Sequence, residues 1–130
     1  MNLSVPPEVG EMIDRERRHF DQAPAAFFRA WKYGVTIAGA ECFGNGTPEG
    51  LERATSRWTL RPNLLTVTDA MDGMSRTQKV FLAAMVSFYD AREGGVLLRR
   101  IGIEGLADFG CLDLERRKVI GNLLLNYNDW

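Results

Sequence analysis

The segment from Ser75 to Tyr89 constrains the fold more than any other part of this 130-residue chain. Ser75 and Gln78 have the spacing of a capping box, in which each side chain accepts a hydrogen bond from the other residue's backbone N–H. Apolar residues then recur at helical intervals, at Val80, Phe81, Ala84, Met85, Phe88 and Tyr89. This pattern predicts an amphipathic helix that supplies the core and ends before Gly94-Gly95.

Two further helices are expected before residue 47. The first should start after Pro6-Pro7, because proline fits the first turn of a helix, and should end at Ala23-Pro24. Its inner face would carry Val9, Met12, Ile13 and Phe20. The second should run from Pro24 to about Phe43, although residues 31–38 also alternate with the period of a strand.

The rest of the chain predicts shorter helices. Thr47-Pro48 should begin one whose inner face reaches Trp58, residues 96–101 and 104–109 should form two more, and Asp113 should cap the last one. The inner face of that last helix would include Ile120, Leu123, Leu124 and Tyr127. The expected fold is therefore all-α, a compact orthogonal bundle of five to seven short helices forming a single helical domain over residues 1–130. Residues 61–74 are left open as helix, loop or a minor irregular or β segment, because Thr66-Val67-Thr68 favours a strand.

Composition narrows the class of protein. Hydrophobic residues make up 45% and charged residues 25% of the chain, as in ordinary globular proteins. No apolar run approaches the roughly 18–20 residues that cross a membrane, and the first residues lack the pattern of a secretory signal, so we expect no membrane partner. Cys42 and Cys111 lie among apolar residues, which favours buried thiols in a reducing compartment, and hence a cytoplasmic protein.

No residue pattern calls for a metal or cofactor. The glycine-rich stretch 44–50 has the wrong spacing for a phosphate loop, and one histidine with two unpaired cysteines does not make a zinc site. His19 ends a charged helix face, which favours a solvated side chain. Glu104 and Asp108, four residues apart, could present two carboxylates on one helix face, which is the basis of a hydrolase or transferase alternative.

A nucleic-acid-binding regulator using the C-terminal helices 96–127 is a second alternative. Its contacts to nucleic acid would come from Arg99, Arg100, Arg116, Arg117 and Lys118. The net charge of −1 and the acids Asp108, Asp113 and Glu115 nearby disfavour it, because phosphate contacts dominate such binding.

Aromatic residues near the C-terminus supply the remaining lead. Tyr127 and Trp130 are difficult to bury completely at the end of a chain, and Tyr and Trp are favoured anchors at protein interfaces. By elimination, the sequence predicts a non-enzymatic protein-interaction module: a small accessory, adaptor or regulatory protein. Its partner would be another protein or a second copy of the chain, as a homodimer.

Overall fold

Helix α4 (Arg76–Ser87) is the centre of the computed structural model, which describes residues 6–128. The capping box that begins it is formed as predicted: the Ser75 side chain accepts from the backbone of Gln78, and the Gln78 side chain accepts from the backbone of Ser75. All seven residues from Val80 to Val86 are buried. A helix buried on every side needs neighbours all round it. Four helices pack against α4: α1 (Pro7–Ala38), α3 (Leu64–Met71), α5 (Ala91–Arg100) and α6 (Leu114–Asn126).

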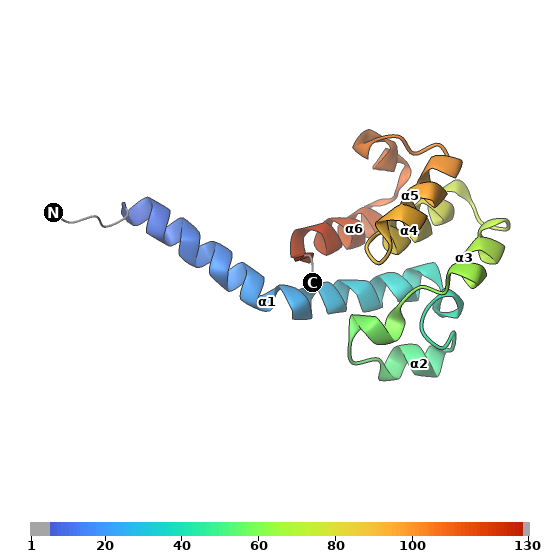
Figure 1. Cartoon of the computed structure of the whole chain (residues 1–130), viewed down its shortest axis with the longest axis horizontal. Coiled ribbons are helices and arrows are strands. Elements are labelled where there is room, and N and C mark those ends of the chain that lie inside the picture. The colour runs from blue at the N-terminus through green and yellow to red at the C-terminus, as the bar shows by residue number, and fades with distance from the viewer. Residues whose placement is uncertain (1–5, 129–130) are drawn as a thin grey trace.

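Helix α1 (Pro7–Ala38) runs through the proline that was expected to end it, so the prediction of two helices is wrong. Pro24 removes only the hydrogen bond that its own N–H would donate to Phe20, at a cost of about 3 kcal/mol. Burial offsets that cost, because Ala23 directly before the proline and Phe27 and Trp31 after it are all fully buried. The helix changes direction near its middle, as a proline within a helix usually causes (Figure 1).

Helix α6 (Leu114–Asn126) lies along the second half of α1 (Figure 1). Asp113 caps it as predicted, with its side chain accepting from the backbone N–H of Arg116. Gly34 of α1 is buried where α1, α4 and α6 meet, and a Cβ atom there would lie 2.8 Å from Met85 Cε and 3.0 Å from a Val119 methyl carbon. The absence of a side chain at Gly34 therefore sets how closely these three helices approach.

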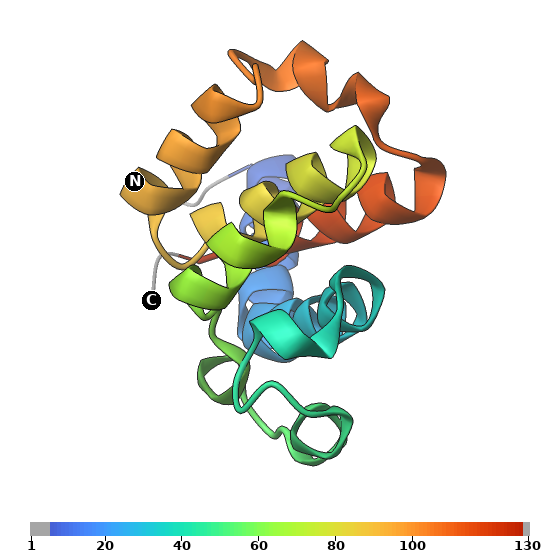
Figure 2. The ribbon, with the colours of Figure 1, turned by 90° about the vertical axis from the view of Figure 1, so that its right-hand side faces the viewer.

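The chain between α1 and α4 forms short elements. Helix α2 (Pro48–Arg53) lies on the side of α1 away from α6, whereas α3 lies beyond the C-terminal end of α1, against α4 (Figures 1 and 2). Residues 61–74, left open by the sequence, contain a helix, because Asn63 caps α3 and Val67 becomes fully buried in it. The only β feature in residues 6–128 is an isolated bridge between Phe43 and Pro62. The elements are η1 (Ala40–Cys42), α2 (Pro48–Arg53), η2 (Arg57–Leu60) and α3 (Leu64–Met71).

Helix α5 (Ala91–Arg100) contains the two glycines that were expected to terminate its predecessor. Helix α4 instead ends at Ser87, and Asp90 caps α5 by accepting from the backbone N–H of Glu93. Gly94 is buried directly against the backbone of Ser87, so tertiary packing, not chain termination, explains this glycine. A loop and the 3₁₀ helix η3 (Leu106–Cys111) then arch over α4 to reach α6 (Figure 2).

The predicted all-α bundle is confirmed, with six α-helices in the described part of the chain. One of the six, α1, is 32 residues long, so the helices are not all short. Within residues 6–128, no helix combines the length and apolar character needed to cross a membrane.

Candidate protein-interaction surface

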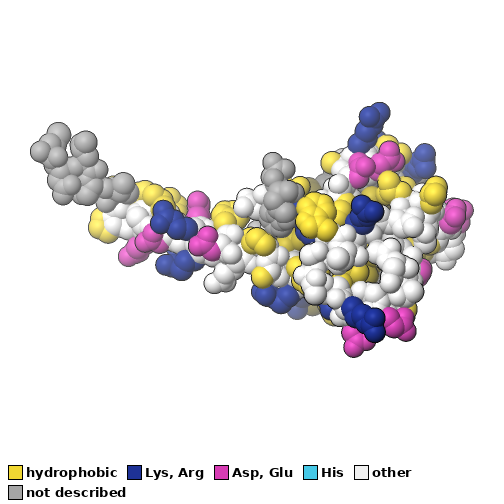
Figure 3. Space-filling model, turned by 60° about the horizontal axis from the view of Figure 1, so that its bottom comes forward, with side chains coloured by type: hydrophobic (Ala, Val, Ile, Leu, Met, Phe, Trp, Pro, Cys, Tyr) yellow, Lys and Arg dark blue, Asp and Glu magenta, His cyan; other side chains and the backbone are white. Residues whose placement is uncertain are grey.

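The first half of α1, residues 7–22, extends away from the other helices and is called the arm (Figure 1). Four large hydrophobic side chains on it are exposed to solvent, each by 37–47%: Val9, Met12, Ile13 and Phe20. We call these four residues the arm stripe. Figure 3 shows hydrophobic side chains along one edge of the arm, with charged side chains beside them.

The arm stripe continues the face of α1 that the core buries. At 100° per residue, Val9, Ile13 and Phe20 point in nearly the same direction as Phe27 and Trp31 farther along the helix. Phe27 and Trp31 are fully buried, whereas the stripe is exposed. The stripe is exposed because α6, which covers the second half of α1, ends at Asn126, and no other described element lies along the arm.

The base of the arm is joined to the end of α6. His19 Nε2 lies 3.0 Å from the carbonyl oxygen of Leu125, so this histidine donates a hydrogen bond to the last turn of α6 and is not simply solvated. Met12, Phe20 and Leu125 line a shallow groove at this junction. Leu125 and Leu124 are 60% and 65% exposed, so Leu124 is not on the inner face as predicted, and the apolar surface extends from the arm onto α6.

Of the two C-terminal residues expected to bind a partner, the structure describes only Tyr127. Tyr127 is half-buried and packs inside the molecule, with its ring centre 6.0 Å from that of Phe27 and 5.9 Å from that of Phe88. Trp130 lies outside the described residues. Tyr127 therefore supports the core in this structure, and an exposed apolar face lies instead on the arm.

An arginine at the centre of an aromatic cluster was missed by the sequence analysis. Arg57 is 94% buried, and its guanidinium carbon lies 4.3 Å from the ring centre of Trp58 and 5.1 Å from that of Phe27. The Tyr89 hydroxyl donates to the Arg57 carbonyl oxygen, and burial raises the pKa of Tyr89 well above its usual value. Trp58, expected on the inner face of a helix, is 57% exposed and covers this arginine, an arrangement that no periodicity indicates.

The basic residues of the nucleic-acid alternative do not form one surface. Arg116 pairs with Asp113 and lies over the Phe81 ring, and Arg117 donates to the carbonyl oxygens of Leu112 and Gly110. These two arginines thus hold the loop before α6, while Lys118 is exposed on α6. Arg99 and Arg100 end α5, and the arch of residues 101–113 separates them from the start of α6 (Figure 2).

The two carboxylates of the hydrolase alternative have different environments. Asp108 accepts hydrogen bonds from the backbone N–H groups of Glu104, at 2.7 Å, and Gly105, at 3.1 Å. These two bonds lower the pKa of Asp108, so the group is an ionised carboxylate that stabilises a turn. Glu104 is exposed, and it meets Asp108 through its backbone instead of its carboxylate.

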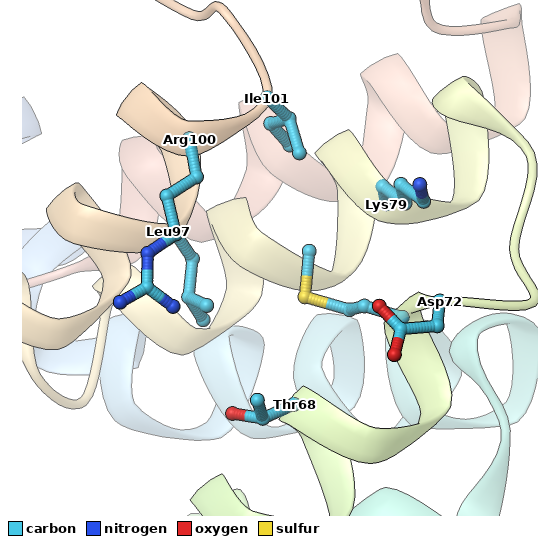
Figure 4. Close-up of a pocket in the computed structure, with 7 residues that line it drawn as sticks. Thr68, Asp72, Lys79, Leu97, Arg100 and Ile101 are labelled. Carbon is cyan, nitrogen blue, oxygen red and sulfur yellow. The ribbon is translucent and has the colours of Figure 1, made fainter.

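A small hollow between α3, α4 and α5 was not indicated by the sequence (Figure 4). Its volume of about 140 Å³ is below the range of usual small-molecule pockets. Met71, Leu97 and Ile101 line it, with the charged side chains of Asp72, Lys79 and Arg100 around them (Figure 4).

Among residues 6–128, no group of three or more His, Cys, Asp or Glu side chains is arranged to hold a metal ion. Cys42 is buried as predicted, and burial raises the pKa of its thiol. Cys111 is exposed in η3, contrary to prediction, because it ends a surface 3₁₀ turn. No family model matches the chain, and no curated protein or solved structure shows significant similarity to it.

Proposed function

We propose that this chain is a non-enzymatic protein-interaction module, an accessory or regulatory protein that binds its partner through the arm stripe. The observation that carries the proposal is the exposure of Val9, Met12, Ile13 and Phe20 on a helix face that is fully buried farther along. Leaving such a face in water is unfavourable, at about 25 cal/mol per Å² of apolar surface. A protein surface that covers the stripe regains this free energy, so the arm is suited to binding protein.

The charges of the arm favour a protein over a lipid surface. Residues 7–22 contain five acidic side chains and three basic ones. Helices that lie on membranes are typically rich in Lys and Arg on their polar face, because cell membranes carry anionic lipids. The proposal places the protein in the cytoplasm, since the exposed thiol of Cys111 is free and thiols persist in a reducing compartment.

Site-specific photo-crosslinking in the cells that produce the protein tests the proposal. A benzophenone amino acid replaces Ile13 in the stripe or, as the control, Arg18, which is exposed on the opposite face of the same helix. We expect discrete protein adducts from position 13 and few from position 18. Equal adducts at the two positions, or none at either, would contradict an interaction surface on the stripe.

A further inference from the structure

We infer that the partner of the arm stripe is a second copy of this chain, with the two arms antiparallel. The inference rests on the proposed function and adds the identity and orientation of the partner. It is carried by the charges beside the stripe, together with the position of the arm beyond the rest of the fold. A symmetric dimer uses the same patch on both copies, so the patch must be complementary to itself.

The flank of the stripe that contains Glu8 and Arg15 is complementary to itself in one orientation only. The two residues are seven positions apart, so they lie about two turns from one another on the same side of the stripe. Both side chains are exposed, and neither forms an ion pair with another of the described residues. When two such helices pack antiparallel, the same flank of each copy meets across the interface, as in antiparallel coiled coils.

The register follows from pairing these charges. If Glu8 of each copy meets Arg15 of the other, the twofold axis passes close to residue 11. That register brings Val9 of each copy near Met12 of the other, so these apolar contacts agree with the ionic ones. The arm projects from the other helices, so the arm of a second copy can lie along this face without meeting the bundle of the first copy (Figure 1).

A parallel pair satisfies the charges less well. In a parallel pair the flank with Glu8 and Arg15 meets the opposite flank of the partner. Glu8 would then lie beside Ile13 and Arg15 beside Phe20, which gives no ion pair and places charged groups against apolar side chains. The charge pattern therefore selects the antiparallel arrangement.

A self-sorting experiment tests both the partner and the orientation. The variant Glu8→Arg/Arg15→Glu keeps the net charge and remains complementary to itself, but in an antiparallel dimer with wild type it creates two like-charge contacts. Wild type and variant, one carrying a short mass tag, are mixed and their dimers are counted by native mass spectrometry. We expect the mixed dimer at about one-fifth of its statistical proportion at low salt, since exposed charge pairs are individually weak. In 1 M salt the proportion should return toward the statistical value.

A matched control separates pairing across the interface from a general charge effect. Glu11 and Arg18 are also seven residues apart, but they lie on the face of the helix opposite the stripe. The variant Glu11→Arg/Arg18→Glu should therefore mix with wild type in statistical proportion. If the Glu8/Arg15 variant mixes equally well, the antiparallel register is overturned. If wild type stays monomeric at high concentration, self-pairing is overturned, while adducts between position 13 and a different protein would still support the proposed function.

Discussion

Two adjacent glycines of α5 should respond in opposite directions to the same substitution. A Cβ atom at Gly94 would lie 2.4 Å from Ser87 Cα and 2.5 Å from Ser87 N, whereas the only atom close to a Cβ at Gly95 is Arg99 Nη1, at 3.3 Å. Carbon atoms in contact are normally 3.5–4.0 Å apart. Gly94→Ala must therefore move the backbones of α4 and α5 apart by about 1 Å, while Gly95→Ala need only shift the end of a flexible side chain.

The expected changes in the free energy of unfolding follow from these different distances at Gly94 and Gly95. Alanine stabilises a helix interior by about 0.8–1.0 kcal/mol over glycine, and overpacking against a fixed neighbour costs about 1–3 kcal/mol. Because the Ser87 backbone cannot rotate away, we take the upper part of that range for Gly94→Ala. The expected change is a loss of about 2 kcal/mol for Gly94→Ala and a gain of up to about 1 kcal/mol for Gly95→Ala.

Thermal unfolding followed by circular dichroism measures both variants. For a domain of this size, 1 kcal/mol corresponds to roughly 4 °C in Tm. We expect Tm to fall by about 8 °C for Gly94→Ala and to rise by about 3 °C for Gly95→Ala. If the two variants shift Tm in the same direction, or if Gly94→Ala is as stable as wild type, the close approach of α4 and α5 at Gly94 is refuted.

Three further predictions concern single groups. Pro24→Ala should raise the free energy of unfolding by up to about 3 kcal/mol in urea titrations, because it restores a helix hydrogen bond, and an unchanged stability would show that the bond is not missing. Cys111 should react with a thiol reagent in the native protein and Cys42 only after unfolding, so equal native rates would contradict their different burial. The pKa of Asp108 is lowered in the folded state, so its stabilising effect is full above the unfolded pKa of about 3.9 and is lost as pH falls through the lower folded value. Asp108→Asn should therefore show a smaller loss of stability than wild type on acidification below about pH 5, and identical pH profiles would count against this role.

Local signals predicted much of the fold. Ser75, Asp113 and Thr47 each cap the helix that the sequence assigned to them, because capping depends only on residues three or four positions apart. The errors at Pro24 and Gly94 share one cause. Both residues disfavour a helix locally, and both lie in helices whose burial against α6 or α4 outweighs the local preference.

The sequence indicated the apolar helix face of the candidate site but not its exposure to solvent. The spacing of Val9, Met12, Ile13 and Phe20 correctly identified an apolar helix face, and it was assigned to the core. Whether such a face is covered depends on where the neighbouring helix ends in space, and no local pattern carries that information. The position of the last turn of α6, beside His19, is what leaves the stripe exposed.

The mass of the protein in solution tests the central claim, that the arm stripe joins two copies of the chain, most directly. Light scattering over a concentration series should show wild type approaching twice the chain mass of 14.6 kDa. Ile13→Glu should remain at the monomer mass with unchanged circular dichroism, while Arg18→Gln, which changes the net charge equally on the opposite face, should behave as wild type. A wild-type mass of 14.6 kDa at every concentration, or a dimer that survives Ile13→Glu, would contradict the account.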